Sequence, residues 1–261
     1  MKHMITSVKN NKVKAWRKLH KRKERIDAGI FLIEGLHLVE EAWKSDWTID
    51  EIIAMDENEL PDWIREVPVE FVSDHVFQHI SQTKTPQGIA AIVKMNNPVK
   101  AGGNHVLLID AVQDPGNLGT MIRTADASGF DGIVLGNETV DLYNDKVIRA
   151  TQGSLFHIPI YQANLKQEMM ELKQEGFHIW ATALSESAKA YNEMTKHDKI
   201  ALMVGNEGSG LQTELLQLAD AIVTIPIYGK AESLNVSVAA GILMYHVKLV
   251  ADSNRTNYNI E

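Results

Sequence analysis

The chain has 261 residues, of which 44% are hydrophobic, so it is long enough for two domains with separate cores. It contains no cysteine, which excludes disulfides, a cysteine nucleophile and cysteine zinc sites, and its sequence shows no cluster of metal ligands. No run of about 18 apolar residues occurs, and the basic N-terminus lacks the apolar segment of a secretory signal. We therefore expect a cytoplasmic protein with neither a membrane nor a metal partner.

The net charge of −8 is distributed unevenly along the chain. Ten of the 26 Lys and Arg residues lie in residues 1–30, which hold only two of the 34 Asp and Glu residues. Such an asymmetry is typical of a basic arm for a polyanion attached to an acidic body. A charged first helix that only faces solvent would give the same count, so charge alone does not decide between the two.

Residues 1–96 are predicted to form a small α/β unit. The aromatic side chains of Trp16 and Phe31 fit its core better than an exposed nucleic-acid surface. Proline and glycine mark residues 97–104 as a linker. The hydrophobic spacing indicates helices over 8–27, 36–44, 60–65 and 74–80, and strands near 31–35, 49–55, 69–72 and 88–94.

Residues 105–261 are predicted to form a second domain around a parallel sheet. Its apolar runs lack the alternation of strands that have one wet face, and helical segments separate them. This pattern favours an α/β fold with helices on both faces of the sheet. The predicted strands are 105–109, 132–135, 156–160, 178–184, 200–204 and 221–225, and the helices are 118–128, 142–153, 164–175, 212–218 and a last one from about 236.

The first candidate site follows the strand at 105–109. A turn at Asp114 and a helix capped by Asn117 place Arg123 two turns into that helix. An arginine at this position could pair with a phosphate through two parallel hydrogen bonds. A surface arginine bonded to Asp114 or Asp126 is the structural alternative.

The second candidate site is the turn from Gly205 to Gly210. It matches neither the dinucleotide fingerprint nor the phosphate-binding loop of nucleoside triphosphatases. Its glycines would let main-chain groups approach a ligand closely, and Glu207 is the one acid within it. A plain connection between strand and helix is the alternative.

The third candidate site joins the strand at 221–225 to the last helix. Ser233 or Asn235 would cap that helix, which is a sufficient structural reason for either residue. Because neighbouring parallel strands form a crevice at their carboxyl ends, these loops are expected to meet around a ligand. A face of small residues would let the last helix pack closely on the sheet or on a second subunit: Ser237, Ala240 and Gly241.

Together the three sites resemble the signature motifs of the SpoU (TrmH-like) RNA 2′-O-ribose methyltransferases of the SPOUT superfamily. The resemblance covers residues 105–250 and rests on Asn117 with Arg123, on the turn around Glu207, and on Ser233 to Asn235. The basic segment 21–25, followed by 31–35, is similar to the substrate-binding domain of the ribosomal-RNA members. The resemblance implies a trefoil-knotted parallel-sheet methyltransferase domain at 105–261, preceded by a small α/β RNA-binding domain at 1–96 that resembles ribosomal-protein modules.

The resemblance also implies the cofactor. Members of the family bind S-adenosyl-L-methionine in a bent shape, mostly through backbone groups. The positions of this chain that match the family's cofactor site are Ala183, Gly205, Ile225 and Leu234.

The implied reaction is an in-line methyl transfer to a ribose hydroxyl. The residues that match the family's catalytic pattern are Arg123, Asn117, Glu207, Ser233 and Asn235. Because a guanidinium has a pKa of about 12 or higher, we expect Arg123 to hold the target phosphate and stabilise the developing alkoxide rather than act as a base. Members are homodimers in which an arginine of one subunit meets the cofactor of the other, and a homodimer is expected here.

RNA is the expected partner. The domain order favours ribosomal RNA over tRNA, because tRNA members of the family often lack the first unit. A tRNA ribose methyltransferase and a non-catalytic RNA-binding ribosome factor are the alternatives, and the presence of all five polar motif residues argues against the second. The residues expected to contact RNA phosphates are Lys18, Lys21, Arg22, Lys23 and Arg25.

Overall fold

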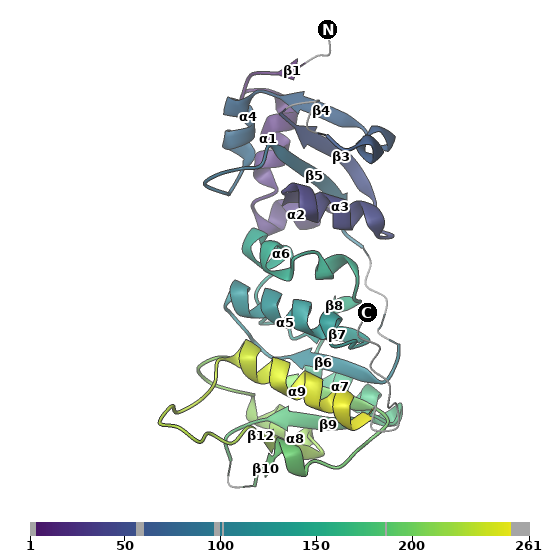
Figure 1. Ribbon diagram of the computed structural model, residues 1–261, viewed down its shortest axis with the longest axis vertical. Coiled ribbons are helices and arrows are strands. Elements are labelled where there is room, and N and C mark those ends of the chain that lie inside the picture. The colour runs from purple at the N-terminus through teal and green to yellow at the C-terminus, as the bar shows by residue number, and fades with distance from the viewer. Residues whose placement is uncertain (1–3, 56–59, 97–99, 101, 186, 252–261) are drawn as a thin grey trace, which may run out of the picture. The chain divides into compact units, whose positions relative to one another are not determined.

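The chain divides into two compact units, each with its own sheet (Figure 1). The computed structural model describes residues 4–55, 60–96, 100, 102–185 and 187–251. The first unit comprises Met1–Asn97 and Asp141–His157, and the second comprises Pro98–Val140 and Ile158–Glu261. The first unit thus includes a segment that the sequence analysis assigned to the second domain, while the boundaries at 96 and 105 stay a prediction. No helix within the described ranges is long and apolar enough to cross a membrane.

The first unit is built on a five-stranded mixed sheet in the order β1-β4-β3-β5-β2. β5 runs antiparallel to β2 and β3, while β1, β3 and β4 are parallel to one another. Trp16 and Phe31 are buried in this unit, as expected. The strands are β1 Met4–Ile5, β2 Ile30–Glu34, β3 Ile49–Ala54, β4 Val69–Val72 and β5 Ile89–Lys94. The helices are α1 Asn11–Lys18, α2 Arg22–Ala28, α3 Leu36–Lys44, α4 Asp74–Ile80 and α6 Asp145–Thr151, with short 3-10 helices η1 Asp62–Glu66 and η2 Ser154–Phe156.

The single helix expected over residues 8–27 is two helices, α1 and α2. The side chain of Asn10 caps α1, and Lys21 is extended (φ −97°, ψ 130°) where α2 begins. In one continuous helix Val13 and Arg25 would lie about 120° apart around the axis, because each residue advances by about 100°. The break between the helices lets both side chains be buried.

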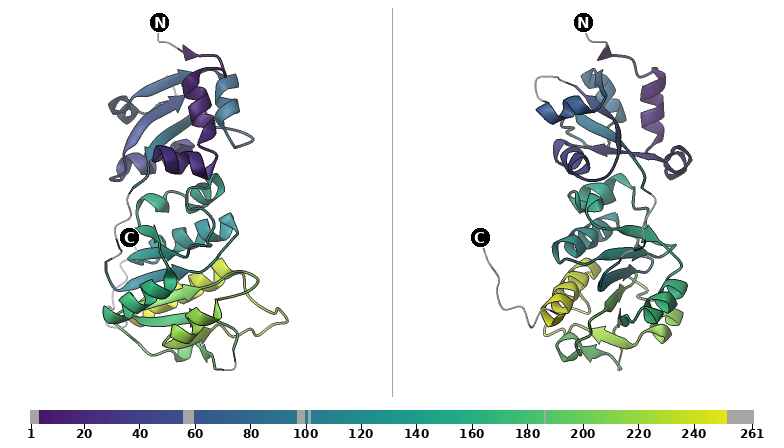
Figure 2. Two further views of the ribbon diagram at one scale, coloured as in Figure 1. Left: turned by 180° about the vertical axis from the view of Figure 1, so that it is seen from behind. Right: turned by 90° about the vertical axis from the view of Figure 1, so that its right-hand side faces the viewer.

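The second unit is built on a seven-stranded sheet in the order β10-β12-β9-β11-β6-β7-β8, in which every pair is parallel. Helices α5 and α9 cover one face of this sheet, and α7 and α8 cover the other (Figure 2). The parallel α/β fold predicted for this domain is confirmed. The strands are β6 His105–Ile109, β7 Gly132–Leu135, β8 Ile160–Gln162, β9 His178–Thr182, β10 Lys189–Ala190, β11 Ile200–Val204 and β12 Ala221–Thr224. The helices are α5 Pro115–Ala127, α7 Leu165–Gln174, α8 Thr213–Leu218 and α9 Val236–Ala251, with the 3-10 helix η3 Tyr191–Glu193.

Two expectations near β8 were wrong. The strand predicted over 156–160 starts only at Ile160, after Pro159, because proline cannot donate a hydrogen bond to a sheet. The helix predicted over 142–153 is shorter, since Asn144 caps α6 by accepting a 2.9 Å hydrogen bond from Lys146 N. The expected trefoil knot stays a prediction.

The strand order determines where the three candidate sites lie. Strands β12, β9, β11 and β6 follow one another in the sheet in that order and point the same way. Their carboxyl ends therefore meet at one edge, and the loops that follow them carry the candidate motifs.

Candidate active site

Gly205 closes the glycine turn at the end of β11 and has no room for a side chain. A Cβ placed on it would lie 2.5 Å from the carbonyl carbon of Gly210 and 2.6 Å from Leu211 N. The turn is held closed by a pair of hydrogen bonds, from Asn206 N to Gly210 O (3.1 Å) and from Gly210 N to Asn206 O (3.0 Å). The glycine is therefore required by the close approach of backbone to backbone within the turn.

Asn206 connects this turn to the first motif, a role that the sequence analysis missed. Its Nδ2 donates a 2.8 Å hydrogen bond to the carbonyl oxygen of Ala111, which has the uncommon φ of 53°. Its Oδ1 accepts hydrogen bonds from Gly208 N (2.9 Å) and Ser209 N (3.0 Å). An asparagine at the start of a glycine-rich turn is typical of such side-chain to backbone bonds, and that signal was available in the sequence.

Glu207 is held by donors from the first motif. Its Oε1 accepts hydrogen bonds from Asn117 Nδ2 (3.0 Å) and Asp114 N (3.2 Å), and its Oε2 accepts one from Gln113 N (3.3 Å). Partial burial raises the pKa of Glu207, but these hydrogen bonds to the charged form outweigh burial and lower the pKa below its usual value. The turn therefore presents an ionised carboxylate at neutral pH.

Asn117 bridges two motifs and does not cap α5 as expected. The cap is Asp114, whose Oδ1 accepts a 2.8 Å hydrogen bond from Asn117 N, because the helix begins one residue later at Pro115. The amide of Asn117 is therefore free to donate to Glu207 and to accept from Asn235 Nδ2 at 3.0 Å. A continuous chain of hydrogen bonds, from Glu207 through Asn117 to Asn235, joins the three motifs.

Asn235, one of the two residues expected to cap α9, directly precedes the helix and caps it. Its Oδ1 accepts hydrogen bonds from Ser237 N (2.9 Å) and Ser237 Oγ (2.7 Å). The hydroxyl of Ser237 also reaches Asn117 Oδ1 at 3.5 Å, so the helix start and the bridging amide support each other. Ser233, the other expected cap, lies in the loop before the helix.

A cavity of about 360 Å³ opens beside this network. The ends of β9, β11 and β12 and the start of α9 form its walls. Its volume falls in the range of roughly 300–1,000 Å³ that is usual for sites of small ligands. The residues expected to hold the cofactor all line it, as do three of the expected catalytic residues: Ala183, Gly205, Ile225 and Leu234, with Glu207, Ser233 and Asn235.

Comparison with known proteins identifies the family. The SpoU rRNA Methylase family model matches residues 104–245, and the MRM3-like substrate binding domain model matches residues 10–91. The chain belongs to the SpoU rRNA methylase family. The three motifs and the cavity lie within the first match, and the basic segment lies within the second.

Two relatives of this chain match along nearly its full length, and a third matches over little more than half of it. The 23S rRNA (guanosine(2553)-2′-O)-methyltransferase RlmP of Bacillus subtilis (strain 168) is 50% identical over 245 residues, which cover 94% of this chain and 98% of the relative. The crystal structure of an AdoMet-bound rRNA methyltransferase from Sinorhizobium meliloti has a TM-score of 0.86 at 32% identity, covering 94% of this chain and 97% of that chain. The TrmH/SpoU tRNA modifying enzyme of A. aeolicus has a TM-score of 0.54 at 32% identity, covering 59% of this chain and 79% of that chain.

Arg123 of this SpoU chain lies outside the lining of the cavity. It is exposed on α5 and makes no hydrogen bond or ion pair with any described residue, so neither Asp114 nor Asp126 holds it. Helix α5 packs closely on α9, where a Cβ at Gly241 would lie 3.5 Å from Thr124 Cγ2. The small face expected on α9 thus meets α5, and the neighbouring guanidinium is available to an anion.

Of the five residues expected to contact RNA phosphates, four are exposed and one is buried. Lys18, Lys21, Arg22 and Lys23 are exposed on α1, α2 and the turn between them. Arg25 is 5% exposed; its Nη1 donates to the carbonyl oxygen of Leu19 (2.6 Å), and its Nη2 pairs with Asp141. The expectation for Arg25 was therefore wrong, because a buried and paired guanidinium cannot meet a phosphate. The other four stay a prediction.

Proposed function

We propose that this protein transfers a methyl group from S-adenosyl-L-methionine to a ribose 2′-hydroxyl of ribosomal RNA. The observation that carries the proposal is the hydrogen-bonded chain Glu207–Asn117–Asn235, which joins the three motifs of the family beside a ligand-sized cavity. Membership of the SpoU family and the 50% identity to a 23S rRNA 2′-O-methyltransferase support the same reaction.

The residues that line the cavity suit S-adenosylmethionine. Ala183, Ile225 and Leu234 give it apolar walls for a flat base, and Gly205 exposes backbone without a side chain. The ionised Glu207 offers a negative charge to a cationic sulfonium. When bound, the cofactor supplies the methyl group as an electrophile, so the protein has to position the two substrates and help the hydroxyl lose its proton.

Arg123 is the proposed anion-binding residue. Since it is exposed and makes no hydrogen bond or ion pair with any described residue, it can pair with the phosphate next to the target ribose and stabilise the developing alkoxide. Its absence from the lining of the cavity of its own chain is consistent with action on the cavity of a second subunit.

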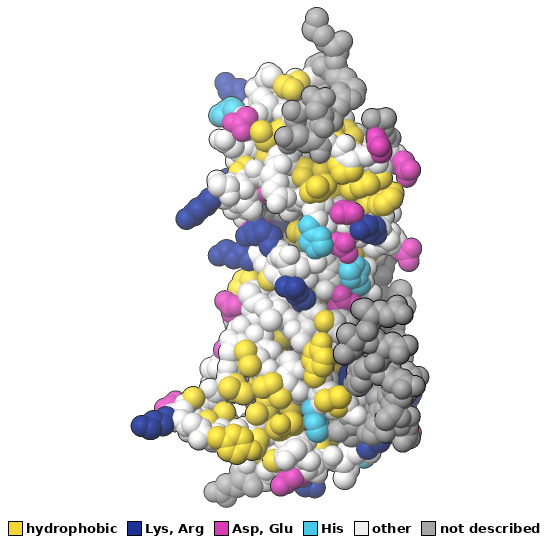
Figure 3. Space-filling model, viewed as in Figure 1, with side chains coloured by type: hydrophobic (Ala, Val, Ile, Leu, Met, Phe, Trp, Pro, Cys, Tyr) yellow, Lys and Arg dark blue, Asp and Glu magenta, His cyan; other side chains and the backbone are white. Residues whose placement is uncertain are grey.

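A homodimer through α9 would provide that second subunit. Four large apolar side chains recur every three or four residues along this helix and are 38–57% exposed: Val238, Ile242, Tyr245 and Leu249. Figure 3 shows hydrophobic side chains gathered over this helix. A contiguous apolar stripe of this kind is typical of a protein interface, and a twofold dimer uses the same stripe on both copies.

The first unit supports ribosomal RNA as the substrate. It matches a substrate-binding domain and exposes Lys18, Lys21, Arg22 and Lys23 on one basic segment. The tRNA enzyme of A. aeolicus covers only 59% of this chain, whereas the B. subtilis rRNA enzyme covers 94%. With ribosomal RNA as substrate, we infer that the protein works in the cytoplasm.

The proposal is tested by methyl transfer from labelled S-adenosylmethionine to unmodified 23S rRNA and, separately, to bulk tRNA. Label in the rRNA that resists alkaline cleavage at one ribose is the expected result. Label in tRNA alone would keep the chemistry and overturn the assignment of the substrate. Absence of label in both, with the cofactor still bound, would favour a non-catalytic RNA-binding factor.

A further inference from the structure

The first unit contains a second cavity, of about 230 Å³. It lies at the junction of β2 and α3, with the loop between α4 and β5 as one wall and α6 as another. None of its residues belongs to the sites described above. The lining residues that matter here are Glu34, His37, Thr83, Thr85, Gln87 and Arg149.

The loop that forms one wall, residues 81–88, is fixed by two polar side chains. Glu34, at the end of β2, accepts hydrogen bonds from Ser81 Oγ (2.7 Å) and Gln82 N (3.2 Å), and also from Thr83 Oγ1. Gln87 Oε1 accepts a 3.0 Å hydrogen bond from Leu36 N at the start of α3. The wall is therefore rigid before a ligand arrives, which reduces the entropy lost on binding.

The cavity offers both flat surfaces and hydrogen-bonding groups. His37 contributes an imidazole ring and Arg149 a planar guanidinium. Unpaired RNA bases stack on groups of these two kinds and are read at their edges by polar side chains. The hydroxyl of Thr85 and the Nε2 of Gln87 make no hydrogen bond with any described residue, so both are available to the edge of a base.

The charges in the cavity suit an uncharged heterocycle better than a phosphate. Arg149 Nη1 is already paired with Asp145 Oδ2 at 2.8 Å, and Glu34 adds a carboxylate. Lys84, by contrast, is exposed on the loop, where it can meet a phosphate of the same strand.

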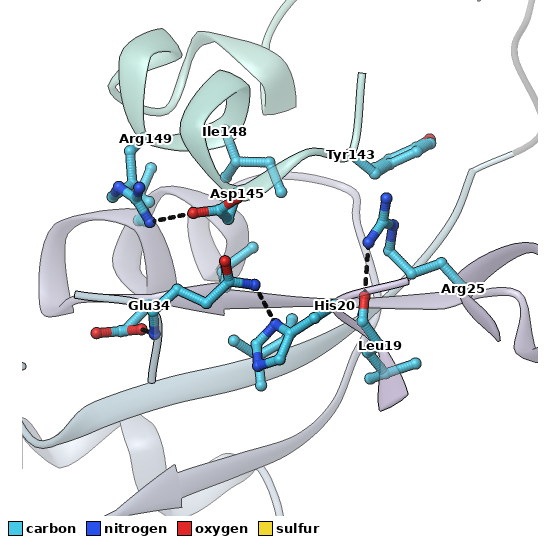
Figure 4. A pocket seen from close by; sticks show the side chains of 12 residues that line it. Leu19, His20, Arg25, Glu34, Tyr143, Asp145, Ile148 and Arg149 are labelled. Carbon is cyan, nitrogen blue, oxygen red and sulfur yellow. Dashed lines mark hydrogen bonds and ion pairs between the residues drawn. The ribbon is translucent and has the colours of Figure 1, made fainter. Parts of the chain in front are cut away.

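The basic segment borders the same region. A narrow chamber of about 20 Å³ shares Glu34, Leu38 and Arg149 with the cavity, and His20 and Arg25 line it as well (Figure 4). In Figure 4, His20 from the turn between α1 and α2 and Arg149 from α6 both point toward this chamber. His20 is next in sequence to the exposed Lys21, so an RNA strand with a phosphate at Lys21 could place a base in the cavity.

We propose that the cavity receives one unpaired base of the substrate RNA, stacked by His37 and Arg149 and read at its edge by Thr85 and Gln87. Its volume of about 230 Å³ lies below the roughly 300–1,000 Å³ of sites that take a whole small ligand, so it fits a single base. The inference rests on the proposed function, because it takes RNA as the substrate. It adds a site of sequence recognition to the sequence-independent contacts of the lysines.

The test uses the full chain and the 23S rRNA transcript, with three variants. Thr85→Phe fills the cavity, His37→Ala removes a stacking surface, and Thr48→Phe places the same bulk at an exposed position of the same unit outside the cavity. Dissociation constants for the RNA are measured at several salt concentrations, and the affinity for S-adenosylmethionine is measured by calorimetry. We expect Thr85→Phe and His37→Ala to bind RNA about 10-fold more weakly, as for the loss of one stacked base.

The salt dependence separates a base from a phosphate in the cavity. Removal of a bound base leaves the slope of log Kd against log salt unchanged, whereas removal of a bound phosphate lowers it. Unchanged slopes, unchanged cofactor affinity and parental behaviour of Thr48→Phe support the proposal. Parental RNA affinity in His37→Ala or a lowered slope would overturn it. Because binding is measured independently of methyl transfer, failure of this inference is distinguishable from failure of the proposed reaction.

Discussion

Substitution of Gly205 by alanine tests the role of the glycine turn most sharply. The new Cβ would lie 2.5 Å from the carbonyl carbon of Gly210, 2.6 Å from Leu211 N and 2.7 Å from Gly210 O. All three are backbone atoms that no side-chain rotation can move, so the turn has to open. Overpacking of this kind costs about 1–3 kcal/mol. For a unit of this size we expect the Tm to fall by about 2–12 °C.

The same strain should appear in cofactor affinity. The cofactor binds to the closed turn, so binding has to supply the about 1–3 kcal/mol of strain that closing the turn costs in the variant. The affinity for S-adenosylmethionine should therefore fall by about 5- to 150-fold. Gly208→Ala is the matched control, because a Cβ there would meet only Asn206 Oδ1 at 3.6 Å, an ordinary van der Waals distance. Calorimetric titration and thermal denaturation of both variants check the expectation. Equal affinities for Gly205→Ala and Gly208→Ala would refute the assignment of the turn to the cofactor.

Three further predictions concern charge and assembly. We expect a smaller slope of log Kd against log salt when the four exposed cations Lys18, Lys21, Arg22 and Lys23 are replaced by alanine. The slope should fall by about 0.7 for each phosphate that is no longer neutralised, while cofactor binding stays intact. An unchanged slope would show that these residues do not contact the RNA. Because the pKa of Glu207 is lowered in the folded state, its contribution to stability is present above the unfolded pKa of about 4.3 and is lost as pH falls through the folded pKa. The Tm of Glu207→Gln should therefore lie below that of the parent at pH 7 and approach it near pH 3, and a constant difference at the two pH values would contradict this account. Ile242→Asp should turn a dimer into a monomer in light scattering, since it places a charge in the apolar stripe of α9; a dimer that persists would exclude this interface.

The sheet of the second unit could be predicted because its strands are buried on both faces. Segments such as 105–109 and 200–204 are continuous apolar runs, and the structure has strands at both. A strand that is buried on both faces is apolar at successive positions, so it can be recognised from its own sequence without knowing which strands pair with it. The short strands β1 and β10, of two residues each, carry no such signal and were missed.

The details of the site depend on contacts between distant parts of the chain. A cap at Asn117 was a reasonable local prediction, but Asp114 and Pro115 start the helix earlier and leave the asparagine to bridge Glu207 and Asn235. Arg25 reads as one more cation of a basic run, yet its partner Asp141 is 116 residues away in the sequence. Pairings of this kind cannot be read from spacing, so the motif residues were recognisable while their hydrogen bonds were not.

Methyl transfer by the parent protein and by Arg123→Ala tests the central claim most directly. Both would be incubated with labelled S-adenosylmethionine and unmodified 23S rRNA, and the RNA would be digested to nucleosides. The account predicts that the parent yields one 2′-O-methylnucleoside, and that Arg123→Ala loses about 10²–10³-fold in kcat while keeping its Tm and cofactor affinity. Label on a base in place of a ribose, or parental kcat in Arg123→Ala, would contradict it.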